Sequence, residues 1–151
     1  MQATLNATLD LLNWLHEECK AELTELTQEQ LDWRPGPDSN SLAILAVHIA
    51  GAEKYWVTEC ILGAPSERDR PGEFATSGLG KRELSDALDD ALGYARSSLA
   101  GLPDSDLSEL RVHPRDGSRV TIAWALGHIL QHTALHLGHM QMTRHWLSEA
   151  A

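Results

Sequence analysis

Apolar side chains recur at three- and four-residue steps in four long stretches of the chain, a spacing that places them on one face of an α-helix. The first stretch covers residues 3–26, and its apolar stripe comprises Leu5, Leu9, Leu12, Leu15, Cys19, Leu23 and Leu26. His16, Glu17 and Glu18 fall outside that stripe. We therefore expect these three side chains on the solvated face of the first helix.

The second stretch begins near Asn40 or Ser41, both favourable N-cap residues, and runs to Leu62, where Gly63 ends the helix. His48 lies at the border of its apolar face or inside it. A lone histidine in such a position is more often a hydrogen-bonded core residue than a metal ligand. His48 therefore indicates a metal site only when it is considered together with histidines elsewhere in the chain.

Residues 63–80 separate the second helix from the third, which covers about residues 81–101 and has no cluster of ligand-type side chains on its apolar face. A connection of this length is unusual between antiparallel neighbours in a compact bundle. At about 3.3 Å per residue, it can instead run back along the ~30 Å of a twenty-residue helix. We therefore expect a long crossover that leaves helices two and three parallel.

The fourth helix follows a short segment with a hairpin pattern. Residues 110–112 and 118–120 flank an Asp-Gly turn, which predicts a small β-ribbon. Thr121 is a favourable cap for a helix that continues to about Ser148. Four amphipathic helices with almost no strand content predict an all-α protein, a four-helix bundle that forms a single domain over residues 1–151.

The charge balance is strongly acidic, with 12 Lys and Arg against 22 Asp and Glu and a formal net charge of −10. Such a surface repels phosphate backbones and anionic lipids, so we expect neither nucleic-acid nor membrane partners. Cys19 and Cys60 lie in separate helical patterns, as is typical of a reduced protein with two buried thiols. Without a signal-peptide pattern or an apolar run of about 18–20 residues, the chain is predicted to be cytoplasmic.

The candidate chemistry lies in the fourth helix, where four histidines share one arc of roughly 80°. They are His128, His132, His136 and His139. Each buried imidazole has two nitrogens that need partners, so a stripe of them on a core face is costly. A metal ion is one partner that would justify the arrangement. A seam of hydrogen-bonded histidines without a metal is the alternative.

Axial rise limits which of these histidines could share one ion, because His128 and His139 lie about 16 Å apart along the helix. His132 forms an i,i+4 pair with either His128 or His136, and the pair of His136 and His139 is geometrically poorer. The third ligand has to come from another helix, where His48 is the core-facing candidate. If helices two and four are antiparallel, the depth of His48 favours a pair that contains His136.

Three segments of the chain form a recognisable combination. They are Leu26–Pro35 (LTQEQLDWRP), Leu45–Trp56 (LAVHIAGAEKYW), and Thr121–Trp124 followed by His128, His132, the His136-Leu137-Gly138-His139 run and Arg144. Together they resemble the DinB/YfiT-type (DinB-like) superfamily of metalloenzymes, over nearly the whole chain. The resemblance implies a four-helix bundle with up-down-down-up connectivity, in agreement with the crossover.

The resemblance also implies a divalent metal ion held by one residue of helix two and two of helix four. Carried over by position, these are His48, His132 and His136. Close relatives often have Glu at the position of His132, so this chain departs from that subgroup. Imidazole ligands suit Zn and Ni, our first expectations, and also Fe and Cu. Mn is a further candidate.

Three protein ligands leave a coordination position open, which is typical of catalytic metal sites. Members of this superfamily include transferases and isomerases that use a low-molecular-weight thiol, so we expect an enzyme of that type acting on a small-molecule substrate. Tyr55 and His139 are candidate proton donors or partners of the ligands, with structural packing as the alternative reading. The other functional readings are a non-enzymatic metal-binding or stress-related bundle and a dimeric interaction module. We expect a homodimer.

Overall fold

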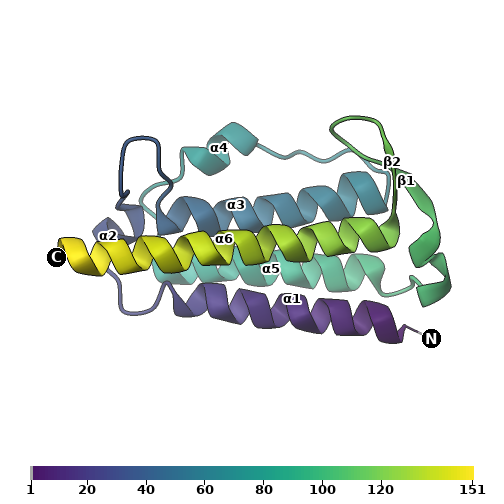
Figure 1. The fold of residues 1–151 in the computed structure, drawn as a ribbon, viewed down its shortest axis with the longest axis horizontal. Coiled ribbons are helices and arrows are strands. Elements are labelled where there is room, and N and C mark those ends of the chain that lie inside the picture. The colour runs from purple at the N-terminus through teal and green to yellow at the C-terminus, as the bar shows by residue number, and fades with distance from the viewer. Residues whose placement is uncertain (1) are drawn as a thin grey trace.

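Four long helices lie side by side in the computed structural model, which describes residues 2–151 (Figure 1). They are α1 (Ala3–Ala21), α3 (Leu42–Tyr55), α5 (Lys81–Leu99) and α6 (Ile122–Ala150). The π-helical segment η1 (Trp56–Ile61) extends α3. Helices α1 and α6 run in one direction, and α3 and α5 run in the other (Figure 1). The predicted four-helix bundle with up-down-down-up connectivity is therefore confirmed.

Shorter elements join these helices. They are α2 (Gln28–Asp32), α4 (Arg70–Phe74), the 3₁₀-helix η2 (Asp104–Ser108), and the strands β1 (Leu110–Val112) and β2 (Arg119–Thr121). The strands pair antiparallel, with Leu110 opposite Thr121, so the expected β-ribbon is present. The side chain of Thr121 also accepts a hydrogen bond from the backbone N–H of Trp124 and caps α6, as predicted.

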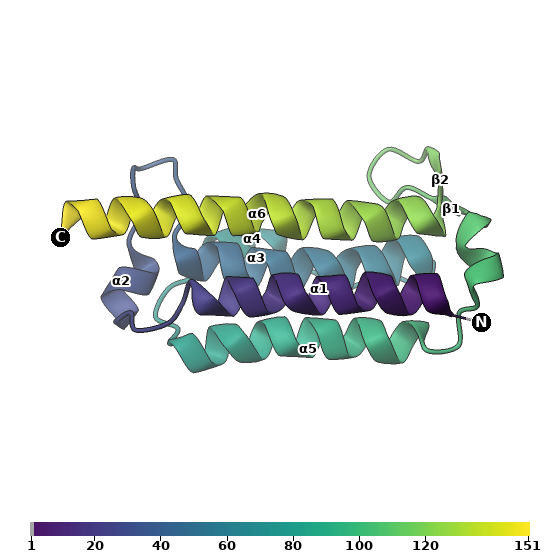
Figure 2. The same ribbon diagram turned by 60° about the horizontal axis from the view of Figure 1, so that its bottom comes forward.

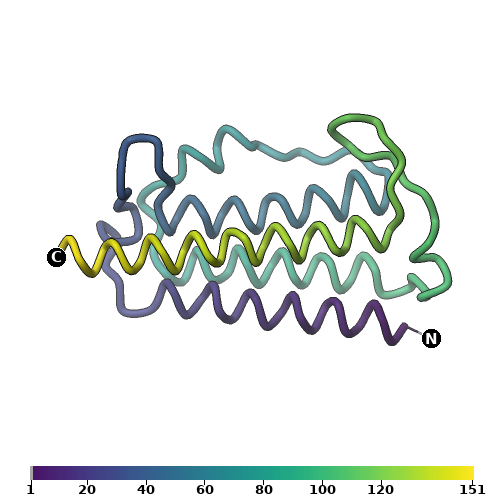
Figure 3. The backbone as a smooth tube through the Cα atoms, in the orientation of Figure 1, coloured from purple at the N-terminus to yellow at the C-terminus, as the bar shows by residue number. Residues whose placement is uncertain are grey.

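The crossover between α3 and α5 returns along the outside of α3, as the backbone trace shows (Figure 3). It is not wholly irregular, because it contains the short helix α4. The carboxylate of Asp69 caps α4 by accepting a hydrogen bond from the N–H of Gly72, and Pro71 occupies its first turn. Helix α4 packs against α3 and so fixes the middle of the crossover beside the bundle.

The first helix ends at Ala21, earlier than the predicted residue 26. A turn follows in which Glu25 has a positive φ of 60°. Arg144 of α6 satisfies two carbonyl groups of this turn, because its Nη1 donates to Glu22 O at 2.7 Å and to Thr24 O at 2.8 Å. The turn after α1 is therefore stabilised by a contact with a helix more than a hundred residues away.

The interior comprises two apolar clusters stacked along the bundle. Buried polar side chains lie where one cluster gives way to the other. His16 on α1 is 0% exposed, and its Nε2 lies 2.7 Å from Oε2 of the equally buried Glu53 on α3. The prediction that His16 is solvated is wrong. Helix α1 packs against both α5 and α6, so its buried arc is wider than one apolar stripe (Figure 2).

Of the other two residues predicted on the solvated face, Glu17 is exposed, as expected, and Glu18 is half-buried. Both cysteines are buried and free. Across residues 2–151, none of the helices combines the length and the apolar character needed to cross a membrane.

Candidate metal centre

The structure brings together the three histidines that the sequence predicts as ligands. His48 comes from α3, and His132 and His136 come from successive turns of the antiparallel helix α6. The Nε2 atom of His132 lies 3.1 Å from Nε2 of His48 and 3.2 Å from Nε2 of His136. Within residues 2–151, these are the residues whose metal-ligating atoms meet as a group of three, all within 4.8 Å of one another.

These separations fit the bond lengths of a metal site. Two nitrogens bound to one tetrahedral zinc ion at 2.0–2.1 Å lie about 3.3 Å apart. The observed 3.1 and 3.2 Å are close to that value. Neutral imidazoles with Nδ1 protonated would present three lone pairs to a common point, an arrangement that a cation stabilises. The donor set therefore fits a divalent metal ion.

The electrostatic environment keeps the α6 histidines neutral. Burial, followed by the neighbouring imidazoles His136, His48 and His128, lowers the pKa of His132 to about 3. Burial and the neighbouring rings of His48 and His139 lower the pKa of His136 to about 4. Near pH 7, both rings are unprotonated at one nitrogen and can donate a lone pair without first losing a proton.

Glu73 of α4 holds His48 in place. Nδ1 of His48 lies 2.9 Å from Oε2 of Glu73, so an Nδ1–H group donates to the carboxylate and leaves Nε2 free as a metal donor. Arg68 donates two hydrogen bonds to the same carboxylate, from Nε at 2.6 Å and from Nη2 at 2.9 Å. A carboxylate behind a metal-binding histidine fixes its tautomer and its ring orientation.

Glu73 stays ionised although it is buried. Burial by itself raises the pKa of its carboxyl group, but hydrogen bonds from His48 and Arg68 and the charge of Arg68 lower the pKa overall. The sequence does not single out this residue, because it lies in the long connection predicted between the second and third helices. The Asp69-Arg70-Pro71 pattern indicates the start of a short helix, but no local signal aims Glu73 at His48.

Gly51 of α3 makes room for the carboxylate of Glu73. A methyl group at this position would overlap Oε1 and the carboxyl carbon of Glu73. We expect Gly51→Ala to displace Glu73 and to lower the affinity for Zn²⁺ by about 10- to 100-fold, the usual effect of losing such an outer partner. Competition titration of the purified protein against a chelator measures this affinity.

The matched control is Gly93→Ala on α5, where an added methyl group meets no atom within 4 Å. Both substitutions replace glycine inside a helix, so both gain the same helix propensity of about 1 kcal/mol. Equal zinc affinity in the two variants would contradict the role assigned to Glu73.

The remaining histidines of α6 flank the group. His139 Nδ1 lies 3.1 Å from Nδ1 of His136, so His139 contacts a candidate ligand from outside. His128 stacks on Trp124 with ring centroids 5.3 Å apart and planes 2° from parallel. Its ring lies 6.1 Å from that of His132. Neither His128 nor His139 belongs to the group of converging nitrogens.

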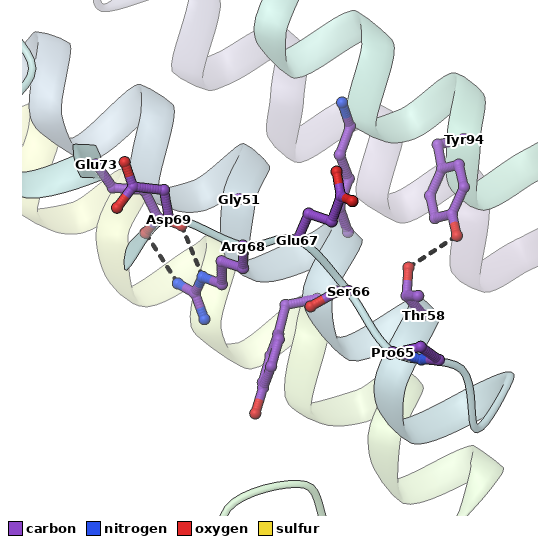
Figure 4. Close-up of a pocket in the computed structure, with 11 residues that line it drawn as sticks. Gly51, Thr58, Pro65, Ser66, Glu67, Arg68, Asp69, Glu73 and Tyr94 are labelled. Atoms are coloured by element: carbon purple, nitrogen blue, oxygen red, sulfur yellow. Dashed lines mark hydrogen bonds and ion pairs between the residues drawn. The ribbon is translucent and has the colours of Figure 1, made fainter. Parts of the chain in front are cut away.

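Tyr55 lies beside Arg68, which binds the carboxylate of Glu73 behind His48. Its ring receives the guanidinium of Arg68, whose Cζ is 5.0 Å from the ring centroid. Burial, with the nearby charge of Glu59, raises the pKa of the Tyr55 hydroxyl, so it stays protonated near pH 7. Tyr55, Arg68 and Glu73 line a cavity of about 410 Å³ between α3, the crossover and α5 (Figure 4). None of the three clustered histidines lines this cavity.

Comparison with known proteins gives a consistent family and fold. The model of a family described as mycothiol-S-transferase matches residues 7–148. Among curated proteins, none matches the chain. A conserved protein from Enterococcus faecalis has a similar structure, with a TM-score of 0.74 and 21% identity over 95% of this chain and 96% of that chain.

Two further solved structures are similar. A DinB-like protein from Bacillus cereus has a TM-score of 0.77 and 18% identity, over 95% of this chain and 92% of that one. YfiT from Bacillus subtilis, described as a probable metal-dependent hydrolase with an unusual four-helix bundle topology, has a TM-score of 0.76 and 16% identity, over 98% and 90%. The resemblance to DinB/YfiT-type proteins is confirmed, and at these identities the likeness to solved structures shows the fold.

Proposed function

The chain belongs to the mycothiol S-transferase family, and from this membership we propose that it is a divalent-metal-dependent transferase of a low-molecular-weight thiol. The observation that carries the proposal is the convergence of three Nε2 atoms from His48, His132 and His136. Three protein donors are the number found in catalytic metal sites, which leave a position to substrate. Zinc and nickel suit the imidazole donors, with iron, manganese and copper as alternatives.

A divalent ion held by the three histidines would lower the pKa of a thiol at its open position, so that the thiol reacts as a thiolate. Residues of the protein keep the donor nitrogens of the site unprotonated and correctly oriented. His132 and His136 are neutral near pH 7, and His48 is oriented by Glu73. A ligand set without a carboxylate leaves the full charge of the ion to attract a thiolate, whereas Glu at position 132 would reduce it by one.

The reaction is a displacement. The thiolate sulfur forms a bond to an electrophilic carbon, the bond between that carbon and its leaving group breaks, and the leaving group departs with the electron pair. The thiol proton passes to solvent, and nothing is oxidised or reduced. His48, His132 and His136, called the histidine group below, would position the sulfur. The remainder of the thiol and the electrophile need binding surfaces nearby.

The test is a metal-dependent transfer assay. The purified protein, loaded with Zn²⁺ or Ni²⁺, is mixed with mycothiol and iodoacetamide, and loss of free thiol is followed. We expect alkylation to be faster than in the metal-stripped protein, and re-addition of the metal to restore the rate. Cysteine replaces mycothiol in a parallel series to measure the contribution of the thiol. If the loaded protein does not accelerate alkylation of either thiol, the proposed activity is wrong.

A further inference from the structure

A second cavity, of about 230 Å³, lies one helical turn from the histidine group. Its apolar wall comprises Pro35, Leu45, Met142 and Trp146, and His139 stands on the side nearest the group. The uncharged polar residues Ser39, Asn40 and Thr143 complete the lining. Met142 and Trp146 are 47% and 46% exposed, so the cavity opens to solvent. We refer to it as the apolar pocket.

The position of the apolar pocket follows from the two helices that form the centre. Leu45 precedes His48 by three residues on α3, and His139 follows His136 by three residues on α6. Because α3 and α6 are antiparallel, both steps lead toward the same end of the bundle, by about 5 Å. The contact between His139 and His136, with their Nδ1 atoms 3.1 Å apart, joins the pocket wall to the centre.

The lining of the pocket defines its ligand. No Asp, Glu, Lys or Arg lines it, although the chain as a whole has a formal charge of −10. A charged ligand would lose hydration there without gaining an ion pair, whereas an apolar group would bury surface against Leu45, Met142 and Trp146. The volume is below the ~300–1,000 Å³ of drug-sized sites, so it suits a ring with short substituents.

The larger cavity beside Tyr55 is less suitable for this role. It is lined by charged side chains that include Lys54, Glu67 and Asp69. It also lies behind His48, on the side of Nδ1, where the ion pair of Arg68 and Glu73 separates it from the converging Nε2 atoms. The apolar pocket contains no such ion pair; it meets the centre through His139, which contacts His136 at Nδ1, and none of the three clustered histidines lines it.

We propose that the apolar pocket binds the hydrophobic part of the electrophile in the thiol transfer, and that this protein therefore prefers electrophiles with a ring or short alkyl group. This inference rests on the proposed function. The thiol sulfur would lie at the histidine group while the pocket holds the electrophile one turn away. In that arrangement the electrophilic carbon would extend from the pocket past His136 to the sulfur, so the two reactants would be held close together.

The test compares two electrophiles with the same thiol and the same metal-loaded protein. 1-Chloro-2,4-dinitrobenzene has a ring for the pocket, and iodoacetamide does not. Met142→Glu places a charge in the pocket, and Trp146→Ala removes part of its wall. In each variant we expect the ratio of kcat/KM for the aromatic electrophile to that for iodoacetamide to fall by about tenfold or more, as for other altered hydrophobic pockets.

Matched controls lie elsewhere on the surface. Leu135→Glu changes a side chain of α6 that is 48% exposed, and Trp14→Ala changes one of α1 that is 55% exposed. Neither residue lines the pocket, so both variants should keep the wild-type ratio. If Met142→Glu and Trp146→Ala also keep the wild-type ratio, the pocket is not the electrophile site.

A binding measurement separates this inference from the proposed function. Equilibrium dialysis with 2,4-dinitroaniline, which has no displaceable halide, needs no catalysis. We expect binding to the wild type and to Leu135→Glu, and binding at least about tenfold weaker to Met142→Glu. Equal binding by all three proteins would overturn the assignment of the pocket. Failure of both electrophiles to react would count against the proposed function, while the dialysis still decides the pocket.

Discussion

Replacing His136 by alanine is expected to abolish stoichiometric metal binding. The substitution removes one of three converging donors and leaves His48 and His132, whose Nε2 atoms are 3.1 Å apart. Loss of an outer partner alone costs about 10- to 100-fold in affinity, so loss of a direct donor should exceed that range. Elemental analysis after dialysis against metal-free buffer measures the metal content. The same result is expected for His48→Ala and His132→Ala.

His145→Ala is the matched control, because His145 is an exposed histidine on the same helix, outside the converging group. It should retain the metal content of the wild type. Near-stoichiometric metal in His136→Ala would defeat the ligand assignment. Loss of metal in His128→Ala together with its retention in His136→Ala would indicate that the other i,i+4 pair of α6, His128 and His132, holds the ion.

Breaking the buried contact between His16 and Glu53 is expected to have the largest effect on stability. Their side chains are 0% and 1% exposed, and their closest nitrogen and oxygen atoms are 2.7 Å apart. Glu53→Leu leaves the imidazole buried without its partner, and we expect the free energy of unfolding to fall by about 1–3 kcal/mol. Urea denaturation followed by circular dichroism measures the change.

The double variant His16→Leu/Glu53→Leu distinguishes a coupled pair from two independent residues. Replacing both partners of a buried pair with apolar groups of similar size removes the unsatisfied group, and is often neutral or stabilising. We therefore expect the double variant to be more stable than Glu53→Leu. If the costs of the two single substitutions add, the side chains do not interact, and the proposed coupling is wrong.

The sequence was sufficient for the architecture because the relevant signals are local or depend on chain length. Helical periodicity predicts the four long helices, and the length of the segment 63–80 predicts the crossover. Axial rise and helix direction restrict which histidines can meet, and the resemblance to DinB-like proteins implies the full set of His48, His132 and His136. Their ligation of a metal stays a prediction, which the variants of His136 and its neighbours test.

What the sequence could not predict depends on contacts between distant elements. His16 is buried against Glu53 of α3, on a helix that also packs against α5 and α6, so the buried surface of α1 is wider than the single apolar stripe seen in the sequence. The turn that follows α1 is stabilised by Arg144 of α6. Glu73 reaches His48 only because α4 packs on α3 and Gly51 leaves space for a carboxylate.

The antiparallel placement of α3 and α6 also has a consequence for how an ion would be captured. His48 and His132 are 84 residues apart in sequence. Bringing two points that far apart together in a flexible chain costs about 4 kcal/mol of loop-closure entropy. In this fold, helix packing offsets this unfavourable free energy before an ion binds. The imidazoles therefore form a preorganised chelate, and the rate of ion exchange should depend on access to the centre rather than on refolding of the chain.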